Sequence, residues 1–132
     1  MAITISEYYT DELLDWNNSI VFYKNEMDEF TQKLGEVIRR NSIVGIAERV
    51  EEHQTLLNKV GDKFYRIQIE IQQQGQALKS DSTLLDDRLI NTETEKRQVE
   101  LRSKMQAAEK EYIDVKFTCY NFLSGTLKKK ND

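Results

Sequence analysis

Residues 9–41 read YTDELLDWNNSIVFYKNEMDEFTQKLGEVIRRN, and this stretch decides the fold. Its apolar residues recur alternately four and three positions apart along the chain. They are Tyr9, Leu13, Trp16, Ile20, Tyr23, Met27, Phe30, Leu34 and Val37. This spacing puts one apolar stripe along one side of a long α-helix and is typical of helices that pack against other helices.

The limits of this first helix are marked by its flanking residues. Thr4 and Glu7 form a capping-box pattern, in which each side chain bonds a free backbone N–H at the helix start. Arg39 and Arg40 suit the negative end of the helix dipole. The sequence therefore predicts a helix over about 5–41.

A second helix is predicted over about 44–79 because the alternating spacing returns. Its stripe consists of Ile43, Ile46, Val50, His53, Leu57, Val60, Phe64, Ile67, Ile71, Gln74 and Leu78. The region of Gly45 reads equally well as a loop, since glycine weakens a helix. Gly61 and Gly75 lie beside the stripe, where the missing side chains would allow two helices to approach closely.

A third helix is predicted over about 83–127, after a break at 79–83 that is rich in capping residues. Its stripe has two parts that are offset by two residues, which predicts either a local change in supercoiling or a local rotation of the helix. The first part is Leu85, Leu89 and Val99, and the second is Leu101, Met105, Ala108, Tyr112, Val115, Cys119 and Phe122. Between them, residues 91–98 are polar, and we expect this segment either to be lightly packed or to cover its neighbours with the stems of Lys96 and Arg97.

Together these patterns predict an all-α protein, an elongated antiparallel up-down-up three-helix bundle that resembles a coiled coil. Short connections make consecutive helices antiparallel. We expect residues 1–127 to form a single helical-bundle domain and residues 128–132 to form a disordered basic tail. No strand pattern is present in the sequence.

Composition narrows the classes of partner. The 132 residues carry a net charge of −4, with 32% charged and 39% hydrophobic residues, which gives no reason to expect a nucleic-acid partner. Neither a signal peptide nor an apolar run long enough to enter a membrane is present, so we expect no membrane insertion and, by default, a cytoplasmic location. Cys119 is the single cysteine and excludes an intrachain disulfide.

Residues with catalytic or ligating chemistry are few, and core packing explains them. His53 is the only histidine and lies on the second stripe, where a buried imidazole needs a hydrogen-bond partner. Tyr112 or Glu109 is the expected partner. Cys119 lies on the third stripe, where a thiol behaves as a small hydrophobe. We therefore expect no enzyme activity, no metal, no cofactor and no small-molecule substrate.

The end of the third helix carries more apolar residues than packing against the second helix explains. If that helix begins near Thr83, its pairing with the second helix ends near Cys119, and an apolar segment projects beyond it. Apolar residues on more than one side of a helix end indicate burial against something else. The expected partner surface consists of Ile113, Phe117, Tyr120, Leu123 and Leu127, with a weaker patch at Leu14, Val21 and Phe22.

Three functions fit these patterns. The leading hypothesis is a non-enzymatic protein–protein interaction or scaffold module that acts through helix–helix packing and forms a homodimer. The first alternative is a chaperone-like or regulatory protein that holds an amphipathic client helix, in a thinly filled region beside Trp16 and Ile20. The second alternative is a bundle that binds a cofactor internally, for which the sequence offers no ligand pattern.

Overall fold

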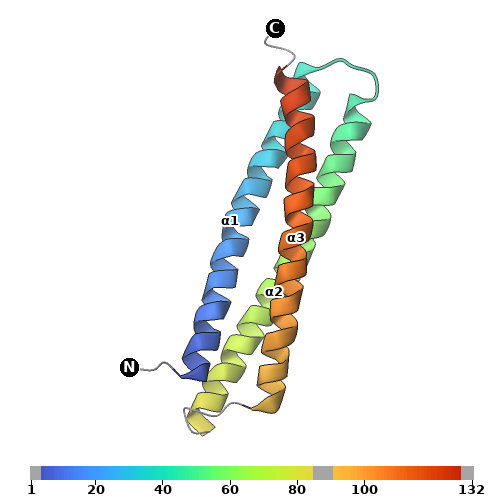
Figure 1. Cartoon of the computed structure of the whole chain (residues 1–132). Coiled ribbons are helices and arrows are strands. Elements are labelled where there is room, and N and C mark those ends of the chain that lie inside the picture. The colour runs from blue at the N-terminus through green and yellow to red at the C-terminus, as the bar shows by residue number, and fades with distance from the viewer. Residues whose placement is uncertain (1–3, 85–90, 129–132) are drawn as a thin grey trace. The chain divides into compact units, whose positions relative to one another are not determined.

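The computed structural model describes residues 4–84 and 91–128, and these residues form three long helices and no strand (Figure 1). They are α1 (Ile5–Arg40), α2 (Ile46–Leu84) and α3 (Thr92–Lys128). Their contacts fall into two compact units, each built from one segment of every helix. Unit 1 comprises Met1–Val21 and Phe64–Ala107, and unit 2 comprises Phe22–Lys63 and Ala108–Asp132.

In unit 1 the contacts give the direction of each helix segment. Glu12 of α1 bonds Gln98 and Arg102 of α3. Gln74 of α2 bonds Gln98, and Glu70 of α2 pairs with Lys104, so the numbering falls along α2 as it rises along α3. The α2 segment is therefore antiparallel to the α3 segment.

Unit 2 repeats this arrangement with other residues. Glu26 of α1 bonds both Tyr112 and Lys116 of α3. Lys63 of α2 pairs with Glu111, while His53, further back along α2, stacks on Phe122. Each unit is thus a segment of an up-down-up three-helix bundle, which confirms the predicted fold class.

The predicted stripes form the core. Of the first stripe, Leu13, Ile20, Met27, Leu34 and Val37 are buried, and its four aromatic residues are half-buried. All seven residues of the stripe that begins at Leu101 are buried. These aliphatic and aromatic side chains supply the hydrophobic free energy that holds the helices together.

The start of α1 and the connection to α2 follow local sequence signals. Thr4 Oγ1 accepts a hydrogen bond from the Glu7 backbone N–H at 3.1 Å, which confirms the predicted cap. Gly45 has a φ of +84°, a left-handed conformation that favours glycine, and α2 begins directly after it. The loop alternative for the Gly45 region is therefore confirmed, and Ile43 is exposed in that loop.

The predicted break at 79–83 is wrong, because α2 continues to Leu84 and α3 begins only at Thr92. Serine, aspartate and threonine each cost only a few tenths of a kcal/mol inside a helix, so a cluster of them permits a helix end without requiring one. Asn91 caps α3 instead, with its Oδ1 accepting a hydrogen bond from the Glu93 N–H at 2.9 Å. Leu85 and Leu89, of the predicted third stripe, lie outside the described residues.

The later turn shifts the pairing of α2 with α3. In an antiparallel helix pair, moving the turn by one residue along the chain shifts by two positions the α3 residue that faces a given α2 residue. His53 therefore stacks on Phe122, with ring centroids 4.4 Å apart, and the predicted bond to Tyr112 or Glu109 is wrong. Those two residues bond Glu26 and Tyr23 of α1.

The same shift removes the predicted projection of the third helix. α3 has 37 residues and α2 has 39, and Phe122 packs near the beginning of α2. Leu123 is also buried within unit 2. The predicted tail is corrected at its first residue, since Lys128 is the last residue of α3, and residues 129–132 lie outside the described part of the chain. A single domain over 1–127 stays a prediction.

A buried polar layer in unit 1 replaces the predicted offset in the third stripe. Thr94 and Gln98 continue the alternating spacing back from Leu101, and both are buried. Gln74 Nε2 donates to the Thr94 carbonyl oxygen at 2.8 Å and to Gln98 Oε1 at 2.9 Å. Within 91–98, Thr94 and Gln98 therefore fill core positions, whereas Lys96 and Arg97, the predicted covering residues, are exposed. Val99 is half exposed because it lies off the continuous stripe.

This polar layer connects all three helices. Gln98 Nε2 donates to Glu12 Oε1 at 2.9 Å, and Arg102 binds the same carboxylate through two N–H groups at 2.7 and 2.8 Å. Burial raises the pKa of Glu12, but the hydrogen bonds from Arg102 and Gln98 and the charge of Arg102 outweigh it and hold the pKa below its ordinary value. The carboxylate is thus kept ionised beside its cation.

Candidate protein-interaction surface

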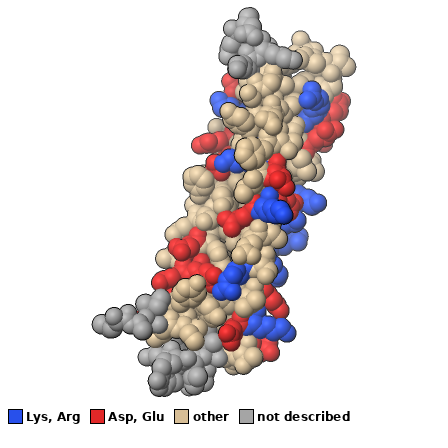
Figure 2. Space-filling view, in the orientation of Figure 1, with Lys and Arg blue, Asp and Glu red and all other residues tan. Residues whose placement is uncertain are grey.

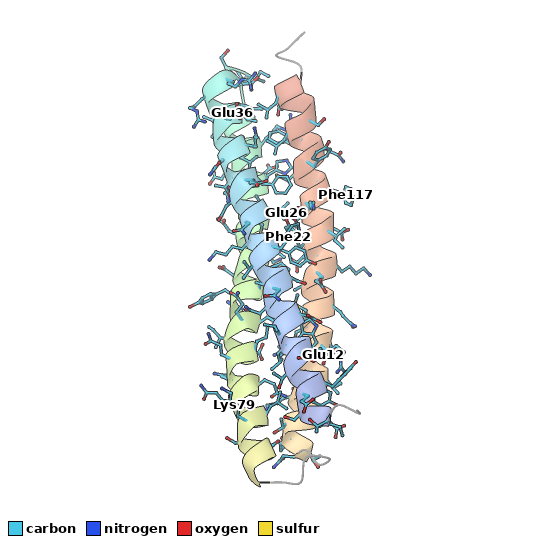
Figure 3. The ribbon with its side chains drawn as sticks, turned by 90° about the vertical axis from the view of Figure 1, so that its left-hand side faces the viewer. Glu12, Phe22, Glu26, Glu36, Lys79 and Phe117 are labelled. Atoms are coloured by element: carbon cyan, nitrogen blue, oxygen red, sulfur yellow. The ribbon has the colours of Figure 1, made fainter. Side chains whose placement is uncertain are left out.

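The outer side of α3 in unit 2 carries the largest exposed apolar stripe among the predicted contact residues. Ile113, Phe117 and Tyr120 are 50%, 62% and 60% exposed. They are separated by four and three positions, so they lie along one side of the helix. Figure 3 shows Phe117 projecting from the outer side of α3. All three predicted contact residues are therefore exposed, and their role in binding stays a prediction.

From Phe117 to Leu127, α3 has no charged side chain, whereas Asp114 and Lys116 lie between Ile113 and Phe117. Residues 117–127 read FTCYNFLSGTL, although charged residues make up 32% of the whole chain. Figure 2 shows mostly uncharged atoms over this C-terminal part of α3, while acidic and basic residues alternate over much of the remaining visible face. A partner that covers only residues 117–127 would remove no α3 charge from water, which avoids a large desolvation cost, whereas a contact that extends to Ile113 also approaches the exposed Asp114.

A groove of about 340 Å³ lies beside this stripe in unit 2, between α1 and α3. Apolar and polar side chains alternate around it. The lining residues are Glu26, Glu29, Phe30 and Lys33 of α1, and Tyr120, Leu123, Ser124 and Leu127 of α3. Its volume is in the range that holds a large side chain or a small ligand.

The polar contacts next to the groove fix α1 against α3. Glu26 accepts hydrogen bonds from the Tyr112 hydroxyl at 2.9 Å and from Lys116 Nζ at 2.8 Å. Burial, together with the bond to Glu26, raises the pKa of Tyr112. Burial and the hydrogen bond to Glu109 likewise raise the pKa of Tyr23 to about 12. Both phenols are therefore hydrogen-bond donors at neutral pH and connect α1 to α3 in unit 2.

Two of the predicted contact residues at the end of α3 need correction. Leu123 is only 7% exposed, so as an exposed contact it is wrong, although its side chain lines the groove. Leu127 is half-buried at the same groove. Their burial follows from the later turn, which brings this part of α3 against α1 and α2.

The weaker predicted patch on α1 does not form one surface. Leu14 and Val21 belong to unit 1 and lie seven positions apart, on the same side of α1. Phe22 belongs to unit 2, and consecutive helix residues point about 100° apart, so it lies on another side. All three are exposed, but only Phe22, one turn before Glu26, is near the groove (Figure 3).

Sequence reasoning missed the α1 half of the groove, which is formed by Glu26, Glu29, Phe30 and Lys33. Phe30 was fully explained as a core residue because it lies on the apolar stripe, yet it is only half-buried. The available signal was the oppositely charged pair Glu29 and Lys33, four positions apart beside Phe30. Recognising it required knowing which α3 residues face α1.

Cys119 and His53 are the residues whose side chains could take part in a reaction, and burial shifts the pKa of each. Burial raises the pKa of the Cys119 thiol to about 11, which keeps the thiol protonated. Burial and the nearby charge of Arg49 lower the pKa of His53. Within the described residues, no three His, Cys, Asp or Glu side chains lie close enough together to hold a metal ion. Over the same residues, none of the three helices has an apolar stretch long enough to cross a bilayer.

Comparison with known proteins finds no matching family model, no matching curated protein and no matching solved structure.

Proposed function

We propose that the protein is a non-enzymatic protein–protein interaction module that acts through helix–helix packing. The contact surface is the groove between α1 and α3 in unit 2, together with the exposed side chains of Phe22, Ile113, Phe117 and Tyr120. The observation that supports this proposal is the uncharged segment 117–127 of α3, with Phe117 and Tyr120 exposed, next to a groove lined by both apolar and charged residues. Contiguous exposed apolar residues often mark interaction sites.

The energetics of such a contact depend on a few large side chains. Aromatic residues that enter a partner's pocket supply most of the binding free energy, and the surrounding charges select the partner. Phe117 and Tyr120 are the candidate anchors, and Glu29 and Lys33 are the candidate selecting charges. A second copy of this chain is the leading partner.

The client-helix alternative is weaker than the sequence indicated. It was based on thin packing beside Trp16 and Ile20, but Ile20 is buried and Gln98 fills the core of unit 1. A client helix that used the α1–α3 groove of unit 2 would contact the same residues as a second copy. The two alternatives are therefore separated by the identity of the partner.

Site-specific photo-crosslinking in the expressing cell tests the proposal. A photoreactive phenylalanine analogue replaces Phe117 in one variant and Tyr65 in a matched control. Tyr65 is an aromatic residue of α2 that is 61% exposed and lies in unit 1. We expect adducts of defined mass from position 117 and none from position 65. Equal labelling at both positions, or none at position 117, would refute the proposal.

A further inference from the structure

We propose that two copies of this chain pair antiparallel about a two-fold axis, with Phe117 of each chain inserted into the α1–α3 groove of the other. This inference rests on the proposed function and specifies both the partner and the geometry at the same surface.

The surface carries both parts of a self-complementary contact. Phe117, the protruding part, lies three positions before Tyr120 and seven before Ser124, and both of these residues line the groove. Residues at such spacings lie on one side of a helix. In a two-fold dimer, the protrusion of each chain can fill the recess of the other, so the same contact is made twice. Two-fold dimers are the commonest closed assembly.

Charge on the α1 side of the groove selects the antiparallel direction. Glu29 and Lys33 both line the groove and lie one helical turn apart. Lys33 also lies 3.6 Å from Glu36 of its own chain, and such an exposed ion pair is weak enough for Lys33 to exchange it for Glu29 of the second chain. In an antiparallel pair the order of these residues is reversed in the second chain, so Glu29 of each chain faces Lys33 of the other. A parallel pair would place like charges opposite each other, which is unfavourable.

Both features place the two-fold axis at the same level. Tyr112 and Lys116 both bond Glu26, so Glu26 lies midway between their levels on α3. Phe117, about one turn further along α3, is therefore close to the level of Glu29. An axis midway between Glu29 and Lys33 moves Phe117 of the second chain toward the level of Lys33, inside the groove. Glu26 does not pair with a charge of the second chain, because its carboxylate already accepts hydrogen bonds from Tyr112 and Lys116 of its own chain.

Sedimentation velocity of the full chain over a wide concentration range tests the dimer. We expect a reversible monomer–dimer equilibrium that Phe117→Asp weakens about tenfold or more, as expected for loss of a buried aromatic anchor. Tyr65→Asp, the matched control, leaves the equilibrium unchanged. Because Phe117 and Tyr65 are exposed, both variants keep the helix content of the parent, which circular dichroism checks.

Charge reversal tests the direction of pairing. Glu29→Lys and Lys33→Glu each put like charges opposite one another and weaken the dimer. The double variant Glu29→Lys/Lys33→Glu restores opposite charges in each pair and recovers the parental equilibrium. A double variant as weak as the single variants would overturn the antiparallel arrangement.

The remaining outcomes separate this inference from the proposed function. A chain that stays monomeric at every concentration, or a dimer that responds to Tyr65→Asp and not to Phe117→Asp, would overturn the inference. If position 117 then still gives a photo-adduct with a different protein, the proposed function stands and the second copy is excluded as partner. If position 117 gives no adduct, both fail together.

Discussion

Replacing Gln98 with leucine should reveal how the buried polar layer of unit 1 contributes to stability. The Gln98 amide donates to the Tyr9 carbonyl oxygen at 3.2 Å and to Glu12 Oε1 at 2.9 Å, and it accepts from Gln74 Nε2 at 2.9 Å. Leucine has a similar size and makes none of these bonds. Each bond contributes about 1 kcal/mol net, and burial of the apolar side chain recovers part of the loss. We expect Gln98→Leu to lower the free energy of unfolding by about 2 kcal/mol.

The double variant Gln74→Leu/Gln98→Leu should cost less than the sum of the two single variants. In Gln98→Leu, Gln74 remains buried and loses an acceptor for one N–H, and its Oε1 already has no partner among the described residues. Removing both amides leaves no buried amide without a partner. We expect a favourable coupling of at least about 1 kcal/mol between the two sites.

Urea unfolding followed by circular dichroism, with thermal unfolding as a second measurement, gives the four free energies of this double-mutant cycle. Arg102→Met is a useful comparison, because it breaks the ion pair with Glu12 and leaves both glutamines in place. Additive effects of Gln74→Leu and Gln98→Leu, within about 0.3–0.5 kcal/mol, would refute the claim that the two amides act as one unit.

Three further variants or measurements test local features. A Cβ on Gly61 would lie 3.9 Å from Met27 Sδ, an ordinary contact, so Gly61→Ala should raise the free energy of unfolding by about 0.5–1 kcal/mol. Gly45 has a φ of +84°, so Gly45→Ala should lower the free energy of unfolding by about 1 kcal/mol. Equal effects of the two variants in urea unfolding would contradict this reasoning. Burial lowers the pKa of His53 in the folded chain, so protonation of His53 favours unfolding. The free energy of unfolding should therefore be constant above about pH 6.5 and fall as the pH drops below it. His53→Gln should remove this dependence in a pH series of unfolding curves. The pKa of about 11 predicts that native Cys119 reacts with a disulfide reagent at mildly alkaline pH about a hundredfold more slowly than in urea, and equal rates would show an accessible thiolate.

The glycines show how a sequence pattern was interpreted too strongly. Gly61 and Gly75 were expected to allow close helix approach because they lie beside the stripe. A Cβ at either position would meet a neighbouring side chain at 3.9–4.0 Å, which is an ordinary distance. The helices therefore do not need glycine at these positions, and over residues 4–84 and 91–128 only Gly45 has a backbone conformation that favours glycine.

The candidate surface was only partly predictable. The exposed stripe of Ile113, Phe117 and Tyr120 could be found because its side of α3 follows from helical periodicity alone. Leu123 was misplaced because its burial depends on which residues of α1 and α2 face it. The groove was missed for the same reason, since it is formed by two helices that are distant in sequence.

The sequence by itself determined that the chain forms three long helices, because the spacing of apolar residues along each segment depends only on that segment's own sequence. Only the tertiary structure decided how far each helix slides along its neighbours. That register depends on where α2 ends, and the polar residues at 79–83 differ too little in helix propensity to set the end. The contacts of Leu78 in the core and of Gln74 with Thr94 and Gln98 favour the longer α2, and the register they fix buries Leu123 and leaves Phe117 beside an open groove.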